Sequence, residues 1–172
     1  MRLKQALQRL EKDSTFREWE KKHKNYCLAH CFVMLDDLNK HIWQIGYYSK
    51  DKDKITTFVI QPDSIQIAED ADVFRKPGTK IRPVDMEKVN IDIDKAIEIA
   101  DTCQRENYKG NDPSKAVIIL QNLDDYGQVF NITFVTQTMK TLNFKISSDK
   151  GKLLKHECVE LFSMDKGSPL TS

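Results

Sequence analysis

The fold is decided by residues 115 to 162, which read KAVIILQNLDDYGQVFNITFVTQTMKTLNFKISSDKGKLLKHECVELF. Four apolar or alternating runs follow one another in this stretch, and turns that carry Asp or Gly separate them. Such runs are typical of antiparallel strands joined by hairpins. We therefore predict a four-stranded antiparallel meander in this part of the chain.

A helix pattern comes directly before the meander, from Asp92 to Asn107. Asp92 can cap this helix, because a side-chain carboxylate accepts hydrogen bonds from backbone N–H groups of the first turn. One apolar stripe runs along the pattern and predicts the face that packs on the meander. Its members are Ile93, Ala96, Ile97, Ala100 and Cys103.

The N-terminal half has the same order of elements. Apolar residues from Leu3 to Leu10 have helical spacing, and Thr15 and Glu18 match a capping box that would begin a second helical segment. Four strand-like runs follow, at residues 26–35, 41–49, 55–60 and 65–68. When the halves are aligned, bulky residues of equal parity coincide in two strands, which predicts an internal repeat. The matched residues are Trp43, Ile45, Tyr47, Phe58 and Ile60 with Phe130, Ile132, Phe134, Phe144 and Ile146.

These patterns predict an α+β protein with two tandem units, each an α-helix packed on a curled antiparallel four-stranded β-sheet. We expect the first unit at residues 1–74, a connector with two prolines and a glycine at 75–91, the second unit at 92–164, and a loose tail at 165–172. The strand positions that carry the bulky residues should face the helix, and the alternate positions should face solvent or a partner. The binding residues predicted on this open side are Tyr48, Val59, Asn131, Thr133, Asn143 and Lys145.

Composition restricts the function. The 27 basic and 26 acidic residues are interspersed, which argues against a nucleic-acid partner, since phosphate binding needs a basic surface. There is neither an apolar run long enough to span a membrane nor a secretory signal pattern. Most of the four cysteines lie in apolar runs, as expected of reduced thiols in a cytoplasmic protein.

Two groups of reactive side chains are candidates for a chemical site. His23, Cys27, His30 and Cys31 could bind a metal, but regular strand alternation would place Cys27 and Cys31 on one face and His30 on the other. His156 and Cys158 share a strand face, yet their backbones are too far apart for a thiol and its base. We therefore predict no catalytic residue, no metal and no cofactor.

One resemblance adds to this interpretation. The Trp/Phe-x-Ile-x-Tyr/Phe pattern, followed by LNFKISSDKGKLL at residues 142–154, resembles PepSY-like domains with a cystatin-like α+β arrangement. The turn at Asp149–Gly151 is one residue short of the usual Asp-x-x-Gly spacing. The chain is also similar to small archaeal and bacterial proteins. The resemblance implies a non-catalytic interaction module and supplies no catalytic residue.

The function expected from the sequence is therefore non-catalytic binding of a protein or peptide, through the open sheet faces or an edge strand. The alternative is a small-molecule-binding protein or an enzyme, with a pocket between helix and sheet lined by aromatic residues such as Trp43 and Phe130. We expect a monomer or a homodimer.

Overall fold

The computed structural model describes residues 1–36, 42–73 and 77–160, and within these ranges the chain forms three α-helices and eight strands. The helices are α1 (Leu3–Lys12), α2 (Ser14–Lys22) and α3 (Ile93–Asn107), with a short 3-10 helix η1 (Met86–Lys88). The strands of the first half are β1 (Tyr26–Leu35), β2 (Trp43–Ser49), β3 (Lys54–Ile60) and β4 (Ile65–Asp72). Those of the second half are β5 (Pro113–Leu123), β6 (Gly127–Thr136), β7 (Lys140–Ser147) and β8 (Leu153–Glu160).

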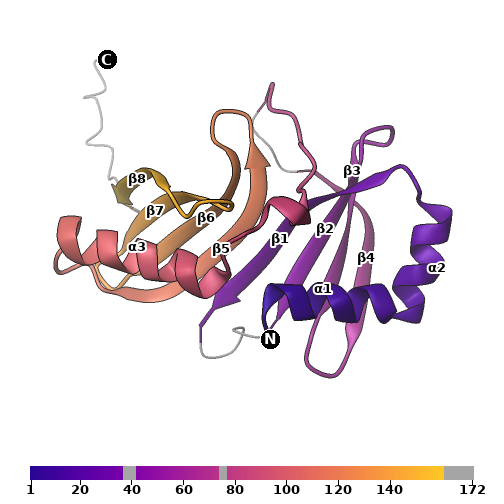
Figure 1. The fold of residues 1–172 in the computed structure, drawn as a ribbon, viewed down its shortest axis with the longest axis horizontal. Helices are drawn as coiled ribbons and strands as arrows, with labels where there is room; N and C mark the ends of the chain where they lie inside the picture. The colour runs from indigo at the N-terminus through magenta and orange to yellow at the C-terminus, as the bar shows by residue number, and fades with distance from the viewer. Residues whose placement is uncertain (37–41, 74–76, 161–172) are drawn as a thin grey trace, which may run out of the picture.

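All of the described strands belong to one antiparallel sheet, in the order β4-β3-β2-β1-β5-β6-β7-β8 (Figure 1). The predicted α+β class is confirmed, but the prediction of two four-stranded sheets is corrected, because β1 pairs with β5 from His30–Gln121 to Leu35–Ala116. Each of these strands would otherwise be the unpaired edge of its own half. Their pairing satisfies both rows of backbone N–H and C=O groups.

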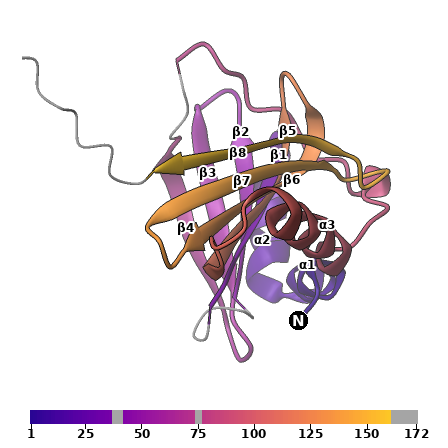
Figure 2. The same ribbon diagram turned by 90° about the vertical axis from the view of Figure 1, so that its left-hand side faces the viewer.

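The helices cover one face of this sheet (Figures 1 and 2). Leu3, Leu7 and Leu10 of α1 and Ala96 and Ala100 of α3 are buried in the same core cluster as the bulky strand residues of both halves. Phe130, Ile132 and Phe134 therefore face the helices, as their alternation in the sequence predicted. The two helical segments that the sequence indicates before the first strand are α1 and α2, so this half has one helix more than the predicted unit.

The helix caps match the sequence at α3 and differ at α2. The carboxylate of Asp92 accepts a hydrogen bond from the Lys95 N–H at 2.9 Å, as predicted. At α2 the cap is Asp13, whose carboxylate accepts from the Phe16 N–H at 3.1 Å. Thr15 therefore lies inside the helix rather than at its cap.

A β-bulge at Ala29 changes the faces of β1. Leu28 pairs with Tyr47 and His30 pairs with Gly46, so Ala29 is an extra residue without a partner in β2. Regular alternation predicted Cys27 and Cys31 on one face, and this is wrong, because a bulge inverts the parity beyond it. Cys27 lies on the face away from the helices together with His30, and Cys31 is buried in the core.

The connector fills the space where β1 and β5 separate. The Val84 N–H donates to the Leu28 carbonyl at 2.8 Å, and Arg82 forms an isolated bridge with Asn122. Val84 and Val89 are buried in the core. The connector therefore ties both halves together. Residues 37–41, between the first two strands, and the predicted tail at 165–172 lie outside the described residues.

No described helix is long and apolar enough to cross a membrane.

Candidate functional site: the open face of the sheet

The open face, which is the side of the sheet away from the helices, has an apolar centre. Phe32 and Met34 of β1 are cross-strand neighbours of Ile119 and Val117 of β5, and all four side chains are half-buried. Their neighbours along each strand, such as Val33 and Ile118, point into the core. We call these four residues the central patch. It lies on the seam between the two halves, where no described helix covers it.

Polar residues of β6 and β7 border the central patch. Asn143 Nδ2 donates to Asn131 Oδ1 at 2.8 Å and to Thr133 Oγ1 at 2.9 Å. Lys145 Nζ donates to Asn143 Oδ1 at 2.7 Å. The structure thus brings together four of the predicted binding residues in one hydrogen-bonded group. The group holds the Asn131 side chain in a fixed orientation.

The two other predicted residues lie in the first half. Val59 is half-buried and belongs to the same cross-strand row as the central patch. This row runs through Val59, Gln44, Phe32, Ile119, Asn131 and Lys145. Tyr48 is on the open side, as its parity predicted, but only 6% of it is exposed, and its hydroxyl donates to Asp53 Oδ1 at 2.7 Å. Because Cys27 and Ile55 flank Tyr48 on the neighbouring strands, it is not available as a binding surface.

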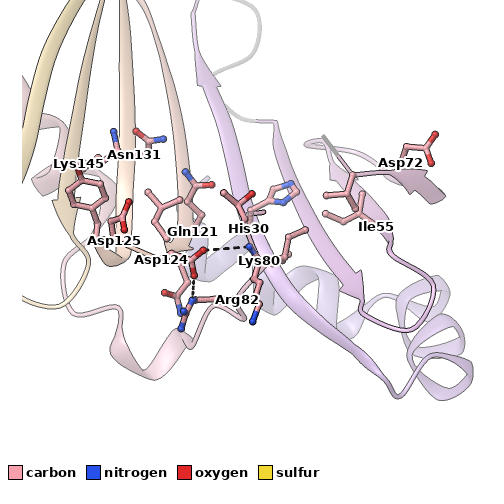
Figure 3. Close-up of a pocket in the computed structure, with 17 residues that line it drawn as sticks. His30, Ile55, Asp72, Lys80, Arg82, Gln121, Asp124, Asp125, Asn131 and Lys145 are labelled. Carbon is pink, nitrogen blue, oxygen red and sulfur yellow. Dashed lines mark hydrogen bonds and ion pairs between the residues drawn. The ribbon is translucent and has the colours of Figure 1, made fainter. Parts of the chain in front are cut away.

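A hollow of about 710 Å³ adjoins the central patch at the end where β1 and β5 separate. Figure 3 shows His30 and Gln121 beside one another, with Asn131 and Lys145 to one side and Ile55 to the other. The rim comes from the connector and from the turn between β5 and β6, and includes Thr79, Lys80, Ile81, Arg82, Asp124, Asp125 and Tyr126.

The position of the His30 side chain depends on a glycine on the next strand. Gly46 is its cross-strand neighbour, and a Cβ atom at this position would lie 2.2 Å from His30 Cε1. Only glycine therefore allows the imidazole to lie flat over β2. Burial lowers the pKa of His30, so the ring is neutral at physiological pH. A glycine inside a strand often marks such a close approach, and Gly46 was the signal in the sequence for this part of the site.

Charges at the rim are largely paired. Arg82 Nε donates to a carboxylate oxygen of Asp124, and the hydrogen bond from Arg82 holds the pKa of Asp124 below its usual range. Lys145 Nζ lies 5.5 Å from the centre of the Tyr126 ring. Asp72 forms an ion pair with Lys54. The hollow therefore combines neutral polar groups at its floor with ion pairs at its border.

The other candidate sites are less complete. Trp43 and Phe130, which the pocket alternative placed between helix and sheet, are at most 2% exposed and belong to the packed core. His156 Nδ1 is hydrogen-bonded to the Tyr108 hydroxyl at 2.7 Å rather than to Cys158. Among the residues that the structure describes, no group of three or more His, Cys, Asp or Glu could hold a metal ion.

Both edges of the sheet carry features that oppose pairing with another strand. The register of β4 on β3 shifts between Ile55 and Thr57, and the register of β8 on β7 shifts between Lys145 and Ile146. Edge strand β4 also presents Glu69, Asp70 and Asp72. Bulges and charged residues are the usual means by which proteins protect sheet edges. The open face is therefore the better candidate for recognition.

Comparison with known proteins adds information about the fold. No protein family model matches this chain, and no curated protein matches it. The fold is similar to the crystal structure of a protein described as a "putative lipoprotein" from Clostridium difficile 630. The two share 16% identity and a TM-score of 0.53 over 87% of this chain and 97% of the other. At this identity the likeness is one of fold.

Proposed function

We propose that this chain is a non-catalytic module that binds a protein or peptide segment on the open face of its sheet. The observation that carries the proposal is the central patch, in which Phe32, Met34, Val117 and Ile119 leave apolar surface open on the seam. Contiguous apolar surface with a polar border is typical of interaction sites.

The partner segment should be mainly uncharged. The central patch is apolar, and the adjacent group of Asn131, Thr133 and Asn143 offers neutral amide and hydroxyl atoms. A charged side chain placed on the apolar patch itself would lose its hydration without gaining a hydrogen bond there. A segment that places apolar side chains on the patch and neutral polar side chains beside it would match both parts of the open face.

We also propose a reducing, cytoplasmic location without a nucleic-acid partner. All four cysteines are free thiols, including the exposed Cys158. Thiols persist in this state in the cytoplasm, whereas oxidising compartments favour disulfides. The lipoprotein description belongs to the structural neighbour.

The proposal is tested by selecting peptides from a random library displayed on phage, with the purified chain as the target. Enriched peptides are synthesised, and their affinities are measured for the native chain, Ile119→Lys and Met139→Lys. Met139 is the matched control, because it is an apolar residue with 54% exposure in the turn between β6 and β7, away from the patch.

The native chain and Met139→Lys should bind the peptides equally, while Ile119→Lys should bind at least tenfold more weakly. Burial of an aliphatic side chain contributes about 1.5–3 kcal/mol, and about 1.4 kcal/mol corresponds to tenfold in affinity. A selection without enriched peptides, or peptides that bind Ile119→Lys as tightly as the native chain, would overturn the proposal.

A further inference from the structure

Three neighbouring side chains in the hollow have hydrogen-bonding groups that remain unused within the described part of the chain. They are the imidazole of His30, the side-chain amide of Gln121 and Nδ2 of Asn131. His30 and Gln121 are directly opposed on β1 and β5. Asn131 is on β6 opposite Ile119, and it is therefore diagonal to Gln121 on the same face of the sheet. Polar groups in a folded protein are normally paired with protein or water, so these three are ready to pair with a ligand.

Their positions are set by the surrounding structure. Gly46 makes room for the His30 ring, which could not lie there over any other residue. The oxygen of Asn131 accepts from Asn143 at 2.8 Å, so its amide nitrogen is the atom left to donate. Groups that are already oriented lose little conformational entropy when a ligand binds.

The chemistry of the three groups defines the ligand. A neutral imidazole presents one donor and one acceptor, and the Gln121 amide presents both kinds of atom. Two of the cations that line the hollow, Lys145 and Arg82, are already engaged with Asn143 and Asp124. A ligand group that both donates and accepts without charge fits this set, and a carboxamide has this character.

The central patch adjoins the three groups and defines what carries the carboxamide. Phe32 follows His30 by two residues on β1, and Ile119 precedes Gln121 by two residues on β5, so each pair shares the open face. The distance between successive side chains on one face of a strand is about 7 Å. When the aliphatic part of a ligand side chain lies on the central patch, the group at its end therefore reaches the hollow.

We infer that the hollow is a specificity subsite that accepts the carboxamide of an Asn or Gln side chain in the bound segment, through His30, Gln121 and Asn131. This inference rests on the proposed binding of a peptide segment to the open face. It adds a preference for one class of side chain at one position.

The test is a titration of the isotope-labelled chain, followed by NMR, with N-acetyl-L-glutamine methylamide as the probe. The glutamate and norleucine analogues are matched probes, since they retain the stem and replace the carboxamide by a charge or a methyl group. Gln121→Ala removes one partner of the probe. Gln44→Ala is its control, because Gln44 is also half-buried on the open face but outside the hollow.

We expect the glutamine probe to shift the side-chain amide signals of Gln121 and Asn131 and the ring signals of His30. Gln121→Ala should weaken this probe about tenfold, as the loss of hydrogen bonds in a partly buried site does, and Gln44→Ala should not weaken it. The same spectra report whether each variant is folded.

Equal shifts with the norleucine probe, or no shift in the hollow with the glutamine probe, would overturn the subsite. Selected peptides that need Ile119 but contain no Asn or Gln would also overturn the subsite while the proposed function stands. Conversely, if the glutamine probe binds but the selection enriches no peptide, the carboxamide site stands and the proposed peptide binding is wrong.

Discussion

Gly46 and His30 form a pair in which the smaller residue determines the position of the larger one. In Gly46→Ala the new methyl group would overlap the imidazole, which must rotate into solvent. The backbone of Gly46 does not have a positive φ angle, so alanine fits the strand itself. We expect the free energy of unfolding to change by less than about 1 kcal/mol, since alanine in a strand also reduces the entropy of the unfolded chain.

The rotation should raise the pKa of His30 toward its ordinary value, because solvent then stabilises the charged ring. The ring signals of His30, followed by NMR over a pH range, measure this change. Thr57→Ala is the control, since Thr57 is the other cross-strand neighbour of Gly46. An unchanged His30 pKa in Gly46→Ala would contradict the conclusion that Gly46 determines the position of the imidazole.

The lowered pKa of His30 also makes stability depend on pH. Between the native pKa and the ordinary value of about 6.5, the unfolded chain binds more protons than the native chain. The free energy of unfolding should therefore fall as the pH decreases through this window, with no further loss from His30 below its native pKa. In His30→Gln this component should be absent. Urea unfolding of both proteins at several pH values measures the difference, and parallel pH profiles would count against it.

At the scale of the element, the start of α2 could be capped by either of two residues, Asp13 or Thr15. Asp13 accepts the hydrogen bond from the Phe16 N–H, whereas the sequence pattern assigned the cap to Thr15. Asp13→Ala should lower the free energy of unfolding by about 1 kcal/mol, because a first-turn N–H loses its partner. Thr15→Ala should change it by much less. Urea denaturation compares the two variants, and a larger loss in Thr15→Ala would contradict the observed cap.

The strands were predictable from local alternation, and their irregularities were not. The predicted run at 26–35 coincides with β1, since ten residues of strand pattern and a polar turn define it. The bulge at Ala29 has no local signal, because it depends on how Leu28 and His30 meet β2. The open-face residues Asn131, Thr133, Asn143 and Lys145 follow from strand parity alone. The hollow does not, since its rim comes from a connector without periodicity.

At the scale of the molecule, the pairing of β1 with β5 joins the two halves. Alternation within each half cannot reveal which edges meet, because residues such as His30 and Gln121 are far apart in the chain. The core cluster is continuous across this seam. We therefore expect both halves to unfold together.

Hydrogen exchange followed by mass spectrometry at increasing urea concentrations measures this cooperativity. Peptides from β2 and β3 should lose protection at the same urea concentration as peptides from β6 and β7, because one core supports both. Loss of protection in one half at a clearly lower urea concentration would show two independent units.

The most direct test of binding on the open face is to map a selected peptide onto the isotope-labelled chain by NMR. We expect the largest shifts at Phe32, Ile119 and Gln121, with small changes along α1 and α3. A shift pattern confined to the helices or to edge strands β4 and β8, with the central patch unaffected, would contradict binding on the open face.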